Sequence, residues 1–83
     1  MQSSIMAQIT IYTTPWCQYC KAAKEYFKSK GFEWNEVDVA QDPTKAQEMI
    51  NKSGQLGVPV IDIDGKIVVG FDKQKINQYL GVS

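Results

Sequence analysis

Two cysteines three positions apart, between a strand-like and a helix-like segment, constrain this chain more than any other feature. Cys17 and Cys20 are the only cysteines among its 83 residues. Residues 9–12 favour a strand, and residues 21–27 contain good helix formers. A C-x-x-C pair at such a junction, in a chain whose start does not resemble a secretory signal, predicts a redox-active dithiol.

The spacing of the pair assigns a different role to each cysteine. A helix over residues 17–30 places the Cβ atoms of Cys17 and Cys20 about 5–6 Å apart, within reach of disulfide geometry. Cys17 then lies in the first turn, where unpaired N–H groups and the helix dipole stabilise a thiolate. Cys20 lies one turn deeper, where burial favours the neutral thiol. We expect Cys17 to attack substrates and Cys20 to resolve the mixed disulfide.

Two other interpretations of the cysteine pair remain open but are less favoured. Zinc normally takes four protein ligands, and this chain has neither a histidine nor a third cysteine. An inert structural disulfide would suit a secreted protein. We expect no metal site, and the nearby carboxylates of Asp62 and Asp64 do not suggest one, because Asp64 already suits a tight turn.

Length and composition indicate one small domain. A hydrophobic content of 43% suffices for one core, and a formal net charge of zero does not point to a nucleic-acid partner. The sequence contains no apolar stretch of membrane-spanning length. We expect residues 1–6 to be a leader, left from expression or disordered, and residues 7–83 to form the domain. The leader lacks the pattern of a signal peptide, so a reducing compartment, the cytoplasm, is expected.

The order of the predicted elements is β-α-β-α-β-β-α. Strands are expected at residues 8–13, 32–39, 59–63 and 66–69, and helices over residues 17–30, after Asp42 and after Asp72. The first β-α-β unit must be parallel, whereas the turn at Asp64 and Gly65 makes an antiparallel hairpin. The predicted class is therefore α/β, with a mixed sheet covered by helices on both faces.

Helix ends and buried faces are also readable from local patterns. Asp42 and Asp72 are expected as N-caps, Pro43 as a first helical residue, and Gly31 and Gly54 as helix stops. The residues expected on the buried faces of the helices are Cys20, Ala23, Phe27, Ala46, Met49, Ile50, Ile76, Tyr79 and Leu80.

Three segments of the chain together carry a resemblance to a known family. Residues 11–20, around the C-x-x-C pair, resemble the active-site segment of glutaredoxins, and residues 57–60 resemble the threonine-valine-proline segment of that family, in which the proline is cis. Residues 69–72 lie where the family carries a glycine pair followed by aspartates. The resemblance spans residues 7–80 and implies a thioredoxin fold and a dithiol oxidoreductase. Its substrates would be protein disulfides or glutathione mixed disulfides.

The resemblance also implies a substrate site around the two cysteines. In the family, the residue before the cis-proline, here Val58, pairs its backbone with the bound peptide or glutathione. The residues expected to bind substrate or glutathione are Trp16, Tyr19, Val58, Pro59, Gly70, Phe71 and Asp72. Trp16 and Phe71 could form an apolar lip around Cys17, or either could pack locally. Tyr19 could equally be an ordinary half-exposed tyrosine, and Trp34 is expected to pack on the sheet.

At several positions the sequence differs from the family pattern, and these differences concern the binding of glutathione. Gln18 replaces a proline, Thr14 a lysine, Leu56 a basic residue and Val69 a glycine. The two basic positions hold a glutathione carboxylate in the family, and each lost charge-assisted bond is worth about 1.5–3 kcal/mol. Residues 70–71 are also similar to the glutaredoxin-like hydrogen donors of ribonucleotide reductase, which thioredoxin reductase reduces.

The electron donor is therefore open between glutathione and thioredoxin reductase. We expect a monomer that acts on protein disulfides with no tightly bound cofactor, and glutathione is a possible cosubstrate. Family members without proline after the first cysteine can hold a [2Fe–2S] cluster between two chains, with glutathione as further ligand. Gln18 keeps this carrier function open as the alternative. A redox-inert adaptor fits poorly with an intact C-x-x-C.

Overall fold

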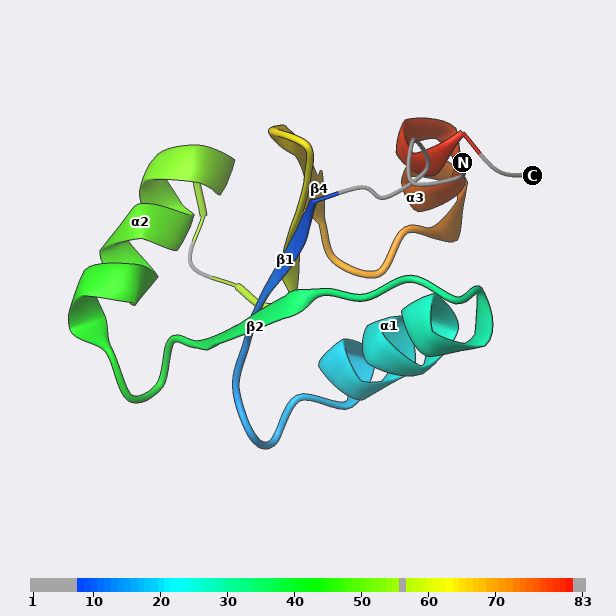
Figure 1. Ribbon diagram of the computed structural model, residues 1–83. Helices are drawn as coiled ribbons and strands as arrows, with labels where there is room; N and C mark the ends of the chain where they lie inside the picture. The colour runs from blue at the N-terminus through cyan, green and yellow to red at the C-terminus, as the bar shows by residue number, and fades with distance from the viewer. Residues whose placement is uncertain (1–7, 56, 82–83) are drawn as a thin grey trace.

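The computed structural model describes residues 8–55 and 57–81, so the expected leader lies outside the described residues. The elements, in chain order, are β1 (Ile9–Thr13), α1 (Gln18–Ser29), β2 (Asn35–Asp38), α2 (Pro43–Ser53), β3 (Val60–Ile63), β4 (Lys66–Val69) and α3 (Lys73–Leu80) (Figure 1). The predicted order of strands and helices is confirmed.

The four strands form one mixed sheet in the order β2-β1-β3-β4. β1 and β2 are parallel, while β3 is antiparallel to both β1 and β4. α1 and α3 lie on one side of this sheet and α2 on the other (Figure 1). The prediction of a mixed sheet with helices on both faces is therefore confirmed.

β2 is shorter than the predicted strand over residues 32–39. It pairs only with β1, from Thr10 beside Asn35 to Thr13 beside Asp38, so its length is set by that partner. Phe32 and Trp34, which precede it, pack against the core instead of extending the ladder. The expectation that Trp34 packs on the sheet is confirmed.

Strand alternation divides the interior into two layers. Ile9 and Ile11 face α1 and α3, whereas Tyr12 faces α2. The larger layer consists of Ile9, Ile11, Ala23, Phe27, Ile61, Ile63, Val68 and Ile76. In the smaller layer, the fully buried side chains among the described residues are Tyr12, Met49 and Val60. Ala46 and Ile50, predicted on the buried face of α2, are half-buried.

The predicted ends of α2 and the predicted start of α3 are observed, whereas α1 ends one residue earlier than predicted, at Ser29. The Asp42 carboxylate accepts hydrogen bonds from the backbone N–H groups of Thr44 and Lys45, and Pro43 begins α2. Gly54 ends α2 with a φ of 78°, in the left-handed region where glycine is favoured. The Asp72 carboxylate caps α3 by accepting from the Lys75 N–H at 3.2 Å.

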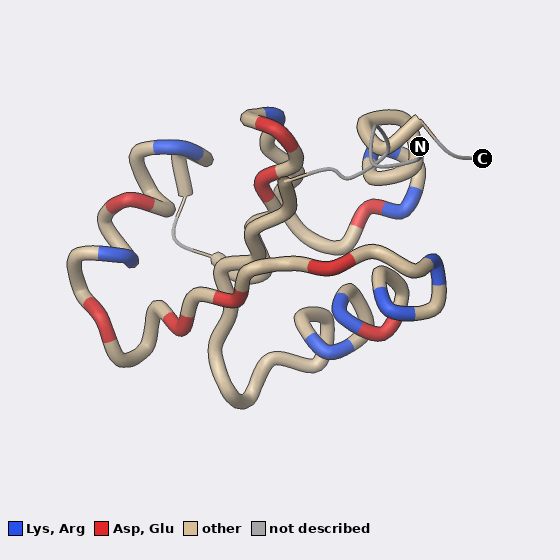
Figure 2. The backbone as a smooth tube through the Cα atoms, in the orientation of Figure 1, with Lys and Arg blue, Asp and Glu red and all other residues tan. Residues whose placement is uncertain are grey.

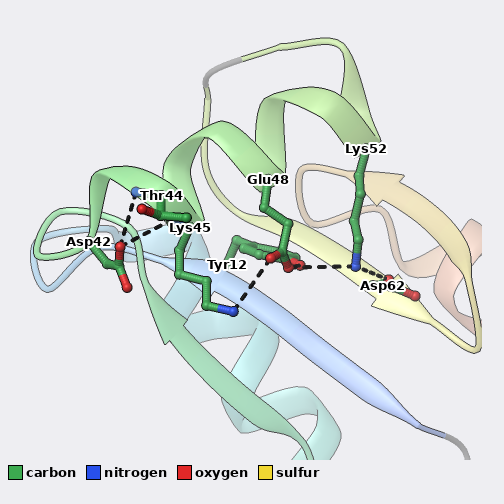
Figure 3. A network of polar contacts seen from close by, with 7 residues as sticks. All are labelled: Tyr12, Asp42, Thr44, Lys45, Glu48, Lys52 and Asp62. Carbon is green, nitrogen blue, oxygen red and sulfur yellow. Dashed lines mark hydrogen bonds and ion pairs between the residues drawn. The ribbon is translucent and has the colours of Figure 1, made fainter.

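A polar network joins α2 to the sheet beneath it (Figure 3). The Tyr12 hydroxyl donates to Glu48 at 2.5 Å, and the Lys52 ammonium donates to Asp62 at 2.8 Å. Lys52 Nζ also lies 5.4 Å from the centre of the Tyr12 ring. We call Tyr12, Glu48, Lys52 and Asp62 the Lys52 network. It ties one helix to strands β1 and β3.

The network shifts the titration of its members. Burial raises the pKa of Tyr12, and its bond to Glu48 adds to the rise. The same bond lowers the pKa of Glu48, and the bond to Asp62 raises the pKa of Lys52. The phenol is therefore held neutral while its carboxylate and ammonium partners are held charged.

Within the part of the chain that the structure describes, no helix is long and apolar enough to cross a membrane.

Candidate active site

Cys17 is the N-cap of α1, one residue before the first helical residue. Its backbone is extended, with φ −86° and ψ 116°, and its sulfur accepts a hydrogen bond from the Cys20 N–H at 3.1 Å. The predicted helix start at Cys17 is therefore one residue early. At the N-cap position, the sulfur has a direct hydrogen-bond donor at the positive end of the helix, and an anionic sulfur gains most from such a bond.

The two sulfurs differ sharply in access to solvent. Cys17 is half-buried, whereas Cys20 is only 1% exposed, and both are free thiols. Burial and, to a lesser degree, a hydrogen bond with Cys17 together raise the pKa of Cys20 to about 11. A proton on Cys20 and access to Cys17 are what a resolving thiol and a nucleophile require.

Two threonines have a role beside Cys20 that was not predicted from the sequence, where Thr14 was considered only as a departure from the family. Thr13 ends β1 and is only 2% exposed. Its hydroxyl and the Thr14 backbone act against burial and lower the pKa of Cys20. The Thr14 carbonyl accepts from the Thr13 hydroxyl at 3.2 Å and from the Cys17 N–H at 3.3 Å. The sequence did offer a signal for this role. Thr13 is a polar residue on the buried side of a strand end, directly before the C-x-x-C loop.

The cis-proline segment lies at the same end of the sheet as the cysteines. The Val58-Pro59 bond is cis, as predicted, with Pro59 buried and Val58 half-buried. Val60, the next residue, pairs with Tyr12 near the end of β1. Because β1 and β3 are antiparallel, the loop after β1 and the segment before β3 meet there. Substrate pairing by Val58 stays a prediction.

The third predicted segment is hydrogen-bonded to the second. The Gly70 N–H donates to the Pro59 carbonyl at 2.8 Å. Gly70 has a φ of 81°, a left-handed conformation that favours glycine. Asp72 is half-buried and caps α3. All three segments therefore converge on one end of the sheet, although their contacts with a substrate remain predictions.

The aromatic residues of the predicted lip behave differently from one another. Trp16 is 73% and Tyr19 is 69% exposed, so aromatic surface is exposed both before and after Cys17 in the chain. Phe71 instead packs locally: it is half-buried, against the core, with its ring centre 5.8 Å from that of Tyr26. Val69, where the family has glycine, is 44% exposed.

The remaining positions near the site carry mixed charge. Gln18 and Lys21 are exposed on the first turn of α1, which contains no acidic residue. Figure 2 shows that basic residues gather along α1, and one of them, Lys24, pairs with Glu36 at 3.0 Å.

Leu56, where the family often has a basic residue, lies outside the described residues. Among the described residues, no group of three histidine, cysteine or acidic side chains could hold a metal ion.

Comparisons with known proteins agree with this geometry. The Glutaredoxin family model matches residues 9–68. An uncharacterized glutaredoxin-like 8.6 kDa protein in the rubredoxin operon of Clostridium pasteurianum is 50% identical over 72 residues, which cover 87% of this chain and 96% of that protein.

Two solved structures share the architecture. A point mutant of the thioredoxin-like protein BC3987 superposes with a TM-score of 0.84 at 29% identity, covering 92% of this chain and 97% of that one. The glutaredoxin-like NrdH-redoxin from Escherichia coli gives 0.74 at 31% identity, covering 86% and 92%. The fold is thus thioredoxin-like, and, given the family model and the 50% identical relative, the chain belongs to the glutaredoxin family.

Proposed function

We propose that this protein is a thiol–disulfide oxidoreductase that reduces protein disulfides through Cys17 and Cys20. The observation that carries the proposal is the asymmetry of the two sulfurs. The accessible Cys17 sulfur caps α1 and accepts the Cys20 N–H, while the Cys20 thiol is buried and keeps its proton.

The reaction proceeds in two exchanges. The Cys17 thiolate attacks one sulfur of the substrate disulfide, which forms a mixed disulfide and releases the first substrate thiolate. Cys20 then gives up its proton and attacks the Cys17 sulfur. The products are the second substrate thiol and a Cys17–Cys20 disulfide. The two electrons come from the dithiol, and an external thiol, glutathione or a reductase, restores it.

Several features favour protein disulfides over glutathione mixed disulfides. Trp16 and Tyr19 expose aromatic surface that a protein partner can cover, since aromatic residues dominate the energetics of such contacts. Val69 adds an exposed side chain one residue before the Gly70–Pro59 bond. The similar NrdH-redoxin is described as having a thioredoxin-like activity profile. We propose a monomer that works in a reducing compartment, the cytoplasm.

The experiment compares two electron sources. Insulin and a glutathionylated peptide are offered to the protein with either glutathione plus glutathione reductase or thioredoxin reductase plus NADPH. We expect insulin to be reduced readily and the glutathionylated peptide poorly, with Cys17→Ser inactive toward both. Saturation by the glutathionylated peptide at low micromolar concentration would overturn the substrate preference. Activity retained in Cys17→Ser would overturn the mechanism.

A charge restoration sharpens the test of glutathione recognition. Thr14→Lys combined with Leu56→Arg supplies two basic groups for a glutathione carboxylate, and one recovered contact of about 1.4 kcal/mol is a tenfold gain in affinity. Activity on the glutathionylated peptide should rise, while insulin reduction stays the same. No gain from the combined substitution would contradict this explanation of the departures.

The cluster-carrier alternative is tested in the same preparation. Cys20 is buried, so each chain offers one accessible thiolate, Cys17, and a [2Fe–2S] cluster would need a second chain and glutathione. The residues of one chain do not by themselves fit a cluster. Brown protein with visible absorbance after anaerobic purification, lost in Cys17→Ser, would favour the carrier.

A further inference from the structure

Tyr26 joins the helix that carries the cysteines to the helix that follows the predicted substrate segment. It lies on α1, half-buried, and its hydroxyl donates to the side-chain oxygen of Asn77 on α3. Its ring meets Phe71 edge to face, with ring centres 5.8 Å apart and planes inclined at 63°. One side chain therefore contacts both the segment before α3 and the middle of α3.

A lysine closes the same cluster. Lys73 Nζ lies 5.5 Å from the centre of the Tyr26 ring and 6.0 Å from that of Phe71, within the range of cation–π attraction. Lys73 is the first residue of α3, directly after the cap Asp72. The Tyr26 ring thus contacts the residues on both sides of Asp72.

The segment held in this way is also bonded at its other end. The Gly70 N–H donates to the Pro59 carbonyl, next to the cis bond. Residues 70–72 are therefore fixed between the cis-proline segment and Tyr26. The Cys17 sulfur is held separately, by the Cys20 N–H. A change at Tyr26 should alter the position of the segment without altering the environment of the nucleophile.

We propose that Tyr26 is a positioning residue that fixes residues 70–72 against α1 and so sets the affinity of the site for its disulfide substrate. The proposal rests on the proposed function. Tyr26 touches neither sulfur in these contacts, so it acts through Phe71 and Asn77. Loss of its hydroxyl should raise the substrate concentration that the site needs, and leave the rate at saturation nearly unchanged.

The test is single-turnover reduction of insulin by the pre-reduced protein, followed over a range of insulin concentrations. Removing one neutral hydrogen bond should raise the half-saturating concentration about two- to tenfold in Tyr26→Phe. The saturating rate and the alkylation rate of Cys17 should stay within about twofold. Tyr79→Phe is the matched control, because its hydroxyl makes none of the hydrogen bonds among the described residues. It should behave as the unmodified protein.

Asn77→Ala removes the same bond from the other side. It should reproduce the Tyr26→Phe shift, and the double variant should add little to either single change. Unchanged half-saturation in both variants overturns the proposal. So does a fall in saturating rate together with slower Cys17 alkylation, which would mean that Tyr26 supports the fold as a whole.

Hydrogen exchange keeps the proposal testable even if the substrate class is wrong. The Gly70 and Lys75 amides, which donate to Pro59 and Asp72, should exchange faster in Tyr26→Phe, while the Ile11 amide on β1 is unaffected. Equal exchange in both proteins overturns the positioning role. Absence of insulin reduction in the unmodified protein, with Cys17 still reactive, would instead contradict the proposed function.

Discussion

The two faces of the sheet are held by different forces. The face toward α1 and α3 buries eight apolar side chains in one cluster. Among the residues that the structure describes, the face toward α2 fully buries three, and the Lys52 network adds hydrogen bonds and an ion pair to this attachment. Burial of apolar area depends little on pH and is not screened by salt, whereas a half-exposed ionic network depends on pH and is weakened by salt. The two faces of the same small sheet should therefore respond differently to pH and ionic strength.

The largest expected difference is in the alkylation rates of the two sulfurs, because Cys20 is buried on the side of α1 that faces the sheet. With the pKa of Cys20 at about 11, only about one thiol in a thousand is ionised at pH 8. Iodoacetamide should therefore label Cys17 at least a hundredfold faster than Cys20 at that pH. Cys17→Ser should remove the fast phase, as mass spectrometry can show. Loss of the fast phase in Cys20→Ser instead would reverse the roles of the cysteines.

The second largest difference is expected in the free energy of unfolding that is lost when a cavity is made on each face. Phe27 belongs to the larger cluster and Met49 to the smaller one, and both are fully buried. Phe27→Ala should lower the free energy of unfolding by about 3–5 kcal/mol, and Met49→Ala by about 2–3 kcal/mol, because α2 can settle onto its thinner layer. Urea unfolding measures both values. A loss at Met49 equal to that at Phe27 would mean that the α2 face is as firmly packed.

The Lys52 network should show a smaller effect that salt reduces. Lys52→Met leaves the mostly buried Asp62 carboxylate without its ammonium partner, which should cost about 1 kcal/mol at low ionic strength. Lys45→Met is the control, because Lys45 makes only a longer, exposed contact with Glu48, at 3.4 Å. In 1 M salt the two variants should converge. A Lys52 effect that salt leaves unchanged would point to packing by its stem.

The smallest effect should be the alkaline titration of Tyr12. The folded-state pKa is raised above the ordinary value of 10.0, so its contribution is complete below pH 10 and is lost as pH rises through the folded value. Tyr12→Phe should flatten the fall in stability above pH 10. It should also lower stability by about 0.5–1.5 kcal/mol at neutral pH, through the lost bond to Glu48. An unchanged alkaline slope would show that another group titrates there.

Most of the apolar face could be predicted from the sequence, because its signals are local. Alternation in residues 9–11 and the spacing of Ala23 and Phe27 on a helix fix which side chains point inward. Caps such as Asp42 and Asp72 are equally local. The C-x-x-C pair could be placed for the same reason, apart from one residue at the helix start.

The rest depends on contacts between residues far apart in the chain. Tyr12 and Glu48 are 36 positions apart, and Tyr26 and Asn77 are 51 apart, so no local pattern pairs them. The sequence left open whether Phe71 joins an exposed lip or packs locally, because its partner, Tyr26, is also far away in the chain. The buried role of Thr13 likewise follows from what packs around Cys20 rather than from its neighbours in the chain.

The capping of α1 by a sulfur couples helix stability to electron affinity. In the reduced protein the Cys17 sulfur accepts the Cys20 N–H in the first turn of α1, and a disulfide sulfur is a far weaker acceptor than a free thiol sulfur that can carry negative charge. Whatever the cap contributes is therefore present in one redox state and largely absent in the other. Each 1.4 kcal/mol of it raises the potential of this two-electron couple by about 30 mV. The hydrogen bond in the first turn of α1 therefore helps to set the reduction potential of the dithiol, that is, how readily the protein gives up its electrons.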